Sequence, residues 1–477
     1  MTDLYPFLAL LVGVVFIVLA IIRFRVHAFI ALMMASFLVG LMSWRTMPDA
    51  GNPAVAAIEM SVREFGNMAG SLGVVIVMAS IIGKCLMDSG AAEVITRRLL
   101  KIFGERRAPA ALLGSGYLLS IPVFFDTVFF LLIPLAKAFR KHTGGHYIQY
   151  VMAICAGGLL THSLVAPTPG PMVMAENLHM DLGLTIMVGI VFSVVPAIVV
   201  GFYYTRWLGQ RHPIEAVEPA QTDTEQQSLS LREAELPPFW LAMMPILLPV
   251  ALIALSSIVS AVNTSLLEQG EAGLDGGILL VLGFLGDRNI AMLLSAAISL
   301  YLLLRQSHTT MGGIMASLES VIGTAGIIIL ITAAGGSFGA MIRQAGVGEV
   351  IQQHVATGVS GSALLFLAFL ISAVMKTAQG SSTVAMITTS AIMYSVIQGI
   401  DLPFHPVYLF LAIGFGGLVF SWMNDSGFWV VCKMGGFTET QTLKTWTTTL
   451  ALMGVVGIVQ VMIVSAILPL NFLPAPN

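Results

Sequence analysis

Charged residues are scarce in this chain of 477 residues. Asp, Glu, Lys and Arg make up 10% of it, whereas a soluble domain carries about 25%. Hydrophobic residues make up 57%, and the mean hydropathy is +0.91. So few charges cannot cover the surface of a soluble protein of this size. The composition therefore excludes a soluble fold and predicts a polytopic protein embedded in a lipid bilayer.

Cysteine is also rare, and no strong charge of one sign is present. The net charge is -3, which gives no basic surface for a nucleic-acid partner. Cys85, Cys155 and Cys432 lie in apolar stretches without the spacing of metal ligands. We interpret all three as packing residues, and we expect neither a metal site nor a cofactor.

No basic residue precedes the first apolar run, 7–22, whereas Arg23 and Arg25 follow it. A cleavable secretory signal has the reverse order, so we expect this run to be retained as a membrane span. By the positive-inside rule it runs from outside to inside. The sequence thus predicts a multi-pass protein of the cytoplasmic (inner or plasma) membrane.

Apolar runs of about the 20 residues that a helix needs to cross a bilayer recur along the chain. A polar stretch, 210–236, divides them and is predicted to be a cytoplasmic linker. It separates an N-terminal transmembrane half, 1–209, from a C-terminal half, 237–477. The predicted spans are 6–22, 28–44, 66–88, 147–180, 183–209, 237–263, 289–305, 319–343, 404–436 and 446–470.

Two apolar segments, 108–139 and 361–398, are too long for one span and are interrupted near their middle. The interruptions, 120–127 and 376–383, contain small, polar or proline residues. Each half of these segments is too short to cross a bilayer comfortably. We therefore predict two re-entrant hairpins whose polar turns lie inside the membrane, buried in protein or beside a wet cavity.

The two halves resemble each other. Residues 89–95 (SGAAEVI) match 345–351 (AGVGEVI), and the same offset aligns Asp126-Thr127 with Ser382-Thr383. The basic stretch 91–107 has a counterpart without Lys or Arg, so the two stretches should lie on opposite sides of the membrane. The prediction is an all-α fold of two inverted-topology repeats, each of about five spans plus one re-entrant hairpin, as in secondary transporters.

Four broken segments should converge in this fold. Two are the hairpin turns, 120–127 and 376–383, and the other two are 166–171 and 423–429. Half-helix N-termini offer unpaired N–H groups and partial positive charge to an anion. Hydroxyl and amide side chains at the breaks would add hydrogen bonds to a small hydroxylated or carboxylated solute. These side chains are Thr127, Thr168, Ser381, Ser382, Thr383, Asn424 and Ser426.

Ionisable residues inside apolar segments are expensive and usually functional. Asp126 and Asp425 are predicted either to carry protons or to cap half-helices. Lys376 would balance the carboxylate of a substrate, pair with one of these two residues, or mark a helix end. His162 is either a proton relay or a packed, hydrogen-bonded residue.

Four motifs resemble the gluconate:proton symporter (GntP) family: 124–135 (FFDTVFFLLIPL), 167–171 (PTPGP), 380–385 (GSSTVA) and 424–429 (NDSGFW). The resemblance implies proton-coupled uptake of sugar acids within a wider superfamily of ion transporters with paired hairpins. Related carriers are often homodimers, and the resemblance extends that expectation to this chain. The family's motif positions here are Asp126, Pro167, Gly170, Pro171, Gly380, Ser381, Thr383, Asn424, Asp425, Gly427 and Phe428.

Three positions depart from the family pattern, because Asp126, Thr168 and Lys376 replace the Glu, His and Arg that are typical there. Arg presents a planar fork to a carboxylate and Lys a point charge, so the exchange is not neutral. The predicted substrate is accordingly gluconate or another small hydroxy acid, such as a different aldonate or glycerate. D-serine, which the family also carries, is a further alternative.

Other function classes are weighed against this one. A sodium-coupled carboxylate carrier is an alternative, because unwound carbonyls and hydroxyls at hairpin turns suit sodium. An enzyme is disfavoured, since Asp126 and Asp425 form the only candidate dyad and no nucleophile motif occurs. A channel is disfavoured because no filter-like repeat is present.

Overall fold

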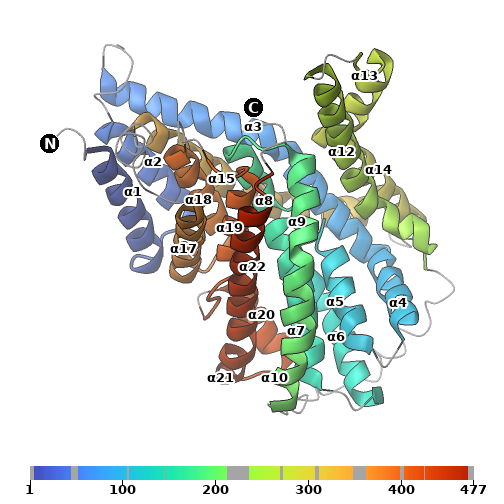
Figure 1. Cartoon of the computed structure of the whole chain (residues 1–477). Helices are drawn as coiled ribbons and strands as arrows, with labels where there is room; N and C mark the ends of the chain where they lie inside the picture. Colours follow the sequence, from blue (N-terminus) through green and yellow to red (C-terminus); the bar gives the residue numbers. More distant parts are fainter. Residues whose placement is uncertain are drawn as a thin grey trace.

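We analysed a computed structural model of the chain (Figure 1). It describes residues 5–43, 52–104, 107–143, 146–211, 236–268, 272–306, 311–346, 361–397, 402–423 and 425–470. Helices form every regular element in these ranges, and none of them contains a strand. Within the same ranges, seven helical segments are long and apolar enough to cross a membrane. The all-α membrane fold expected from composition is confirmed.

Three of these seven segments lie in the first half of the chain: Pro53–Asp88, Tyr147–Asn177 and Leu182–Arg211. The helices are α1 (Tyr5–Ile22), α2 (Ala28–Met42), α3 (Pro53–Asp88), α4 (Ala91–Phe103), α5 (Ala108–Leu119), α6 (Phe125–Thr143), α7 (Tyr147–Leu164), α8 (Pro169–Asn177), α9 (Leu182–Pro196), the π-helix η3 (Ala197–Tyr204) and α10 (Thr205–Arg211).

The second half begins with three helices that fold back on one another at one edge of the molecule (Figure 1). Its helices are α12 (Phe239–Glu268), α13 (Gly276–Leu285), α14 (Arg288–Gln306), α15 (Met311–Gln344), α17 (Gly361–Gln379), α18 (Ser382–Ile397), α19 (Val407–Gly416), α20 (Ser426–Gly435), α21 (Glu439–Thr442), the π-helix η5 (Leu443–Thr447) and α22 (Thr448–Ile467).

Two elements differ from the sequence prediction. The third span begins at Pro53 rather than at 66, because Asn52 caps the helix by accepting a hydrogen bond from the Ala54 amide at 3.1 Å. The polar residues in these additional turns lower the local hydropathy, so the apolar pattern did not predict the helix start at Pro53. The short helix α13, all of it unburied, was not predicted; Asp275 caps its first turn through two amides.

Both predicted interruptions of the long apolar segments are present as turns between antiparallel helices. Helices α5 and α6 are joined by 120–124, and α17 and α18 by Gly380 and Ser381. Gly380 has a φ of +80°, a left-handed conformation that ends α17 at little steric cost because glycine has no Cβ. The breaks are shorter than predicted, so Asp126 lies in the first turn of α6 and Lys376 in the last turn of α17.

Two spans are discontinuous, as the motifs predicted. Helix α7 ends at Leu164 and α8 begins at Pro169, where proline's missing amide is harmless in a first turn. Helix α19 ends at Gly416 and α20 begins at Ser426. This second break therefore lies earlier in the chain than 423–429, and residues 427–429 are helical.

Helices from the two halves of the chain pack together rather than forming separate bodies. Ser36 of α2 shares a 2.7 Å hydrogen bond with Ser337 of α15, and Ser337 donates to the Ser61 carbonyl of α3. Asn177 of α8 donates to the Ser390 hydroxyl of α18 at 2.9 Å. Within the first half, a Cβ at Gly157 of α7 would lie 2.1 Å from the Leu113 carbonyl oxygen, so only glycine lets α7 contact α5.

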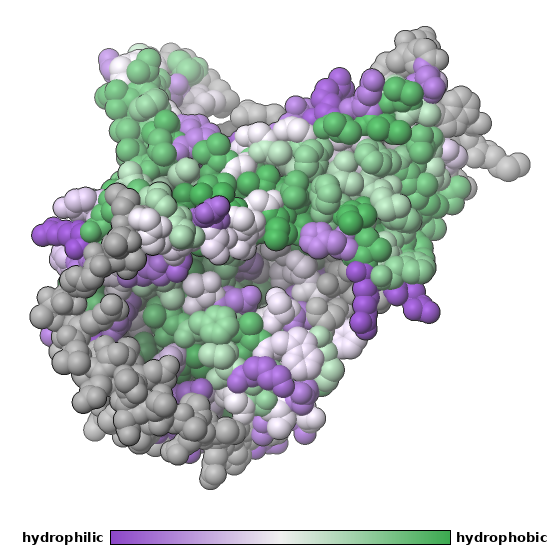
Figure 2. Space-filling model, turned by 180° about the vertical axis from the view of Figure 1, so that it is seen from behind, coloured by the Kyte–Doolittle hydropathy of each residue, from purple (hydrophilic) through white to green (hydrophobic). Residues whose placement is uncertain are grey.

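Basic residues gather at the end of the molecule that holds α4, α10 and α21 (Figure 1). This end agrees with the cytoplasmic side that the positive-inside rule predicts. Elsewhere, large hydrophobic side chains are exposed over broad areas of the surface, as Figure 2 shows for one face. A bilayer would cover such areas. The basic residues concerned include Arg98, Lys101, Arg140, Arg211, Lys433 and Lys444.

The inverted relation of the two repeats stays a prediction, as does the division of the chain at the linker. The linker residues 212–235 and most of the second copy of the repeated motif, 347–351, lie outside the described residues.

Candidate functional site

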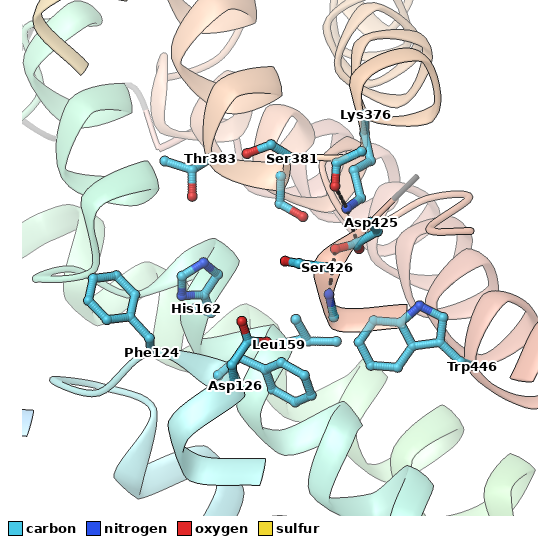
Figure 3. Close-up of a pocket in the computed structure, with 14 residues that line it drawn as sticks. Phe124, Asp126, Leu159, His162, Lys376, Ser381, Thr383, Asp425, Ser426 and Trp446 are labelled. Carbon is cyan, nitrogen blue, oxygen red and sulfur yellow. Dashed lines mark hydrogen bonds and ion pairs between the residues drawn. The ribbon is translucent and has the colours of Figure 1, made fainter. Parts of the chain in front are cut away.

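The two hairpin turns and the second discontinuous span meet around one cavity (Figure 3). Its volume is about 330 Å³, enough for a small organic solute. Helices α6 and α7 form one side, and the turn of α17 and α18, the start of α20 and η5 form the other. The lining residues are Phe124, Phe125, Asp126, Leu159, His162, Lys376, Gly380, Ser381, Ser382, Thr383, Asp425, Ser426, Gly427 and Trp446.

Most of the residues singled out from the sequence lie in this lining. Asp126, His162, Lys376, Gly380, Ser381, Ser382, Thr383, Asp425 and Ser426 all belong to it. The lining does not include Thr127, Thr168 or Gly170, and Asn424 lies outside the described residues. Thr168 instead donates to the Val165 carbonyl at 2.6 Å, and Gly170 packs against Met386. Thr168 therefore bonds across the α7–α8 break, whereas Gly170 lets α8 pack closely against α18.

The first side of the cavity presents two polar groups without protein partners. Asp126 makes no ion pair and no side-chain hydrogen bond with any described residue, although its carboxyl points into the cavity (Figure 3). His162 is half-buried, its buried Nδ1 atom has no hydrogen-bond partner among the described residues, and its ring contacts Phe124 with centroids 6.4 Å apart. Buried polar groups normally have partners, so these two groups are suited to a ligand or a proton.

A buried ion pair lies on the other side. Lys376 Nζ lies 2.6 Å from Asp425 Oδ2 and donates to the Gly380 carbonyl oxygen at 2.7 Å. Its side chain is 1% exposed, against 13% for Asp425. Asp425 also caps α20, because its Oδ1 accepts a hydrogen bond from the Gly427 amide at 2.9 Å. Of the roles predicted for Lys376, the structure contains the pairing with Asp425 and the position at a helix end.

Three hydroxyl groups at the helix starts have no partner among the described residues: those of Ser382, Thr383 and Ser426. Ser381 is different, because its Oγ accepts a hydrogen bond from the Val384 amide at 3.3 Å and caps α18. The first amides of α18 and α20 have no carbonyl partners within their own helices. The cavity therefore offers amide and hydroxyl donors beside one ammonium group, a set suited to a carboxylated, hydroxylated solute.

Sequence reasoning missed the apolar part of the lining. Phe125 and Trp446 contact each other with ring centroids 5.5 Å apart, and Leu159 lies beside them. Trp446 belongs to η5, which follows the last of the four broken segments and is not part of it. The motif 124–135 contains Phe125 but did not indicate its contact with Trp446, and no motif marked Leu159 or Trp446. An apolar residue inside an apolar run looks the same in sequence whether it faces lipid, the core or a cavity. Only the π-helical turn, a feature frequent at functional sites, distinguishes Trp446.

The free hydroxyl of Ser382 allows a direct test of the hairpin turn. We expect Ser382→Ala to weaken solute binding by about 0.5–1.5 kcal/mol, the net value of one neutral hydrogen bond, or roughly 2- to 13-fold. The half-saturation concentration for transport by purified protein in liposomes measures this change. An unchanged value would mean that this hydroxyl does not contact the solute. Ser395→Ala in the same helix, whose hydroxyl donates to the Ala391 carbonyl, is the matched control.

Comparison with known proteins identifies the family. The model of the GntP family permeases matches residues 5–467. The chain belongs to the GntP permease family. A gluconate permease from Pseudomonas aeruginosa is 32% identical over 470 residues, which cover 98% of this chain and 99% of the relative. The D-serine transporter DsdX of Escherichia coli is 29% identical, with 96% of this chain and 98% of the relative covered.

The fold of this GntP family member also has a solved counterpart. The YdaH transporter of Alcanivorax borkumensis superposes with a TM-score of 0.63 at 16% identity, over 94% of this chain and 99% of that chain. At this identity the likeness concerns the fold alone. Family and helices together establish a multi-pass membrane permease, which confirms the family resemblance found in the motifs.

Proposed function

We propose that this GntP family permease is a proton-coupled symporter of gluconate or a related sugar acid or small hydroxy acid. Its place would be the cytoplasmic (inner) membrane. The observation that carries the proposal is the cavity at the hairpin turns, where Lys376 lies beside three hydroxyls without partners in the described part of the chain. These belong to Ser382, Thr383 and Ser426. An ammonium group suits a carboxylate and the hydroxyls suit a polyol chain. A Pseudomonas aeruginosa relative named as a gluconate permease supports the same substrate class.

Charge balance supports proton coupling. The cavity holds two carboxyl groups, Asp126 and Asp425, and one ammonium group, Lys376. A bound sugar acid adds a further negative charge in surroundings where excess charge is expensive. A proton that enters with the solute removes that excess. Asp126, Asp425 and His162 are the residues we propose to accept it.

The proposed role is transport without catalysis. Asp126 and Asp425 face the same cavity, but Asp425 is bound by Lys376 and by the Gly427 amide. Its carboxylate is therefore paired with Lys376 and an amide rather than with Asp126, as an acid–base dyad would require. The proposal involves neither a metal nor a cofactor, and a homodimer stays a prediction.

Uptake of labelled gluconate into proteoliposomes tests the proposal. We expect accumulation when the outside is acidic, loss of accumulation with an uncoupler, and no change when sodium replaces potassium. Empty liposomes, with the same gradient imposed, provide the control for leakage. Uptake that is independent of the pH gradient but follows a sodium gradient would show that sodium, and not the proton, is the coupling ion.

A second candidate substrate is D-serine. Its support is the unpaired carboxyl of Asp126, which would accept an ammonium group while Lys376 or the helix amides bind the carboxylate. The name of the Escherichia coli relative points the same way. Competition decides between the two: excess unlabelled D-serine would block gluconate uptake only if both solutes use this cavity, and direct uptake of labelled D-serine would confirm transport.

The residue at 376 should affect substrate choice. We expect Lys376→Arg to reduce uptake and to shift the substrate profile toward longer aldonates, because a planar fork replaces a point charge in a fully buried position. Uptake of gluconate and glycerate, compared as the ratio of their kcat/KM values, measures the shift. An identical ratio in the variant and the original protein would place Lys376 outside the substrate contacts.

A further inference from the structure

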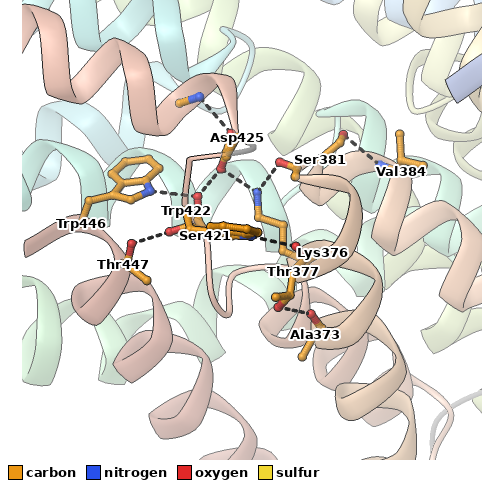
Figure 4. Close-up of polar contacts among 12 residues, drawn as sticks. Ala373, Lys376, Thr377, Ser381, Val384, Ser421, Trp422, Asp425, Trp446 and Thr447 are labelled. Carbon is orange, nitrogen blue, oxygen red and sulfur yellow. Dashed lines mark hydrogen bonds and ion pairs between the residues drawn. The ribbon is translucent and has the colours of Figure 1, made fainter. Parts of the chain in front are cut away.

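A series of hydrogen bonds leads from the Lys376–Asp425 ion pair to Ser421 and Trp446, two residues outside the four family motifs (Figure 4). Trp446 Nε1 donates to Ser421 Oγ at 2.8 Å, and the Ser421 hydroxyl donates to Asp425 Oδ2. Oδ2 is the same oxygen that contacts Lys376 Nζ. Ser421 and Trp446 are both 0% exposed. Water therefore does not replace either donor.

Further contacts fix both ends of this series of hydrogen bonds. The hydroxyl of Thr447, next to Trp446 in η5, donates to the Ser421 carbonyl oxygen at 2.6 Å. Two side chains of η5 therefore bind Ser421, one at its backbone and one at its side chain. The indole ring of Trp446 contacts Phe125, the neighbour of Asp126 on the first hairpin. Lys376 in turn binds the Gly380 carbonyl at the turn of the second hairpin.

The orientation of these bonds has a chemical meaning. Asp425 accepts from the Ser421 hydroxyl, the Lys376 ammonium and the Gly427 amide, and all three donors favour an ionised carboxylate. Trp446 orients the Ser421 hydroxyl, since the indole N–H can only donate and the hydroxyl must then donate onward. In this arrangement Lys376 is engaged by the protein and is not available to a solute.

We infer that Ser421 and Trp446 are positioning residues that keep Asp425 ionised against Lys376, so that Lys376 becomes available to a solute carboxylate only when Asp425 accepts a proton. This inference rests on the proposed function. The proton moves to Asp425 Oδ2, the ion pair with Nζ breaks, and the solute carboxylate takes the place of Asp425. Solute and proton then enter the cavity together. The other charged or titratable groups facing it are Asp126 from α6 and His162 from α7.

Removing the hydroxyl donor should therefore change the pH at which the solute binds. Without the Ser421 hydroxyl the carboxylate is less stabilised, and Asp425 accepts its proton at a higher pH. We expect Ser421→Ala to raise the pH midpoint of solute affinity by about one unit, equivalent to a tenfold change in the protonation equilibrium. Trp446→Phe should shift it in the same direction by roughly half as much, because it acts through Ser421.

The measurement is the half-saturation concentration for gluconate counterflow across a pH series, with equal pH on both sides of the membrane. Trp429→Phe is the matched control, because the Trp429 indole also donates a hydrogen bond, in its case to the Met423 carbonyl oxygen at 2.7 Å, and Trp429 lies outside the cavity lining. Ser421→Thr retains the hydroxyl and should restore the original midpoint. Midpoints in Ser421→Ala and Trp446→Phe that equal those of the original protein and Trp429→Phe would overturn the inference.

A second readout needs no substrate. The infrared band of a protonated carboxyl in the purified protein, assigned by its loss in Asp425→Asn, should appear at a higher pH in Ser421→Ala than in the original protein. A protein that carries no gluconate would overturn the proposed substrate, while this band still tests the inference. A band with the same pH midpoint in both proteins would contradict it whatever the substrate is.

Discussion

Asp425→Asn is expected to abolish gradient-driven accumulation of gluconate while solute exchange continues. For one proton per solute, an inward gradient of two pH units supports an accumulation of about 100-fold, because each unit is worth about 1.36 kcal/mol. Without a titratable group at 425 the gradient cannot act through the Lys376 pair, and the ratio should fall to about one. Exchange should persist, because Lys376 then has no competing carboxylate in the cavity.

Folding must be separated from coupling in this experiment. Removing one partner of a buried ion pair typically costs about 3–5 kcal/mol. Asparagine, however, keeps the shape of the side chain and is a favourable N-cap, so the Gly427 contact at the start of α20 can be retained. Size-exclusion chromatography of the purified variant and counterflow activity report the folded fraction. Accumulation that remains intact with its normal pH dependence would refute a coupling role for Asp425.

Lys376→Met should have the largest effect on binding. Methionine has a similar volume without the charge, so it removes the ammonium group proposed to receive the solute carboxylate and leaves Asp425 unpaired. Truncating one member of a buried charged pair costs about 2–5 kcal/mol, so the half-saturation concentration should rise by roughly 30-fold or more. Counterflow over a wide range of gluconate concentrations measures this change.

The double variant Lys376→Met/Asp425→Asn provides the control for this second prediction. Replacing both members of a buried ion pair removes the uncompensated charge, and such replacements are often neutral for stability. We therefore expect the double variant to recover the folded yield lost by Lys376→Met but not its gluconate transport. Recovery of transport as well would show that Lys376 serves the fold alone and does not contact the solute.

Several features of this protein followed from sequence alone because they depend on local chemistry. The spans follow from apolar runs of membrane length, and the interruption around Gly380 follows from a residue suited to the left-handed φ found there. The broken segment 166–171 contains three prolines, which cannot continue a helix, and α8 begins at one of them, Pro169. The rare ionisable residues Asp126 and Lys376 stood out because burying them is expensive, and both line the cavity.

Other features depended on contacts between residues far apart in the chain, which no local pattern encodes. The sequence left Lys376 three roles, and only the packing of α17 against the break before α20 places it on Asp425 rather than Asp126. Thr168 looked like a solute ligand, yet the chain folds back so that its hydroxyl reaches the Val165 carbonyl. Sequence determined which residues are costly to bury, whereas the tertiary structure decided which of them meet, because partners such as Trp446 and Ser421 are brought together only by the packing of separate helices.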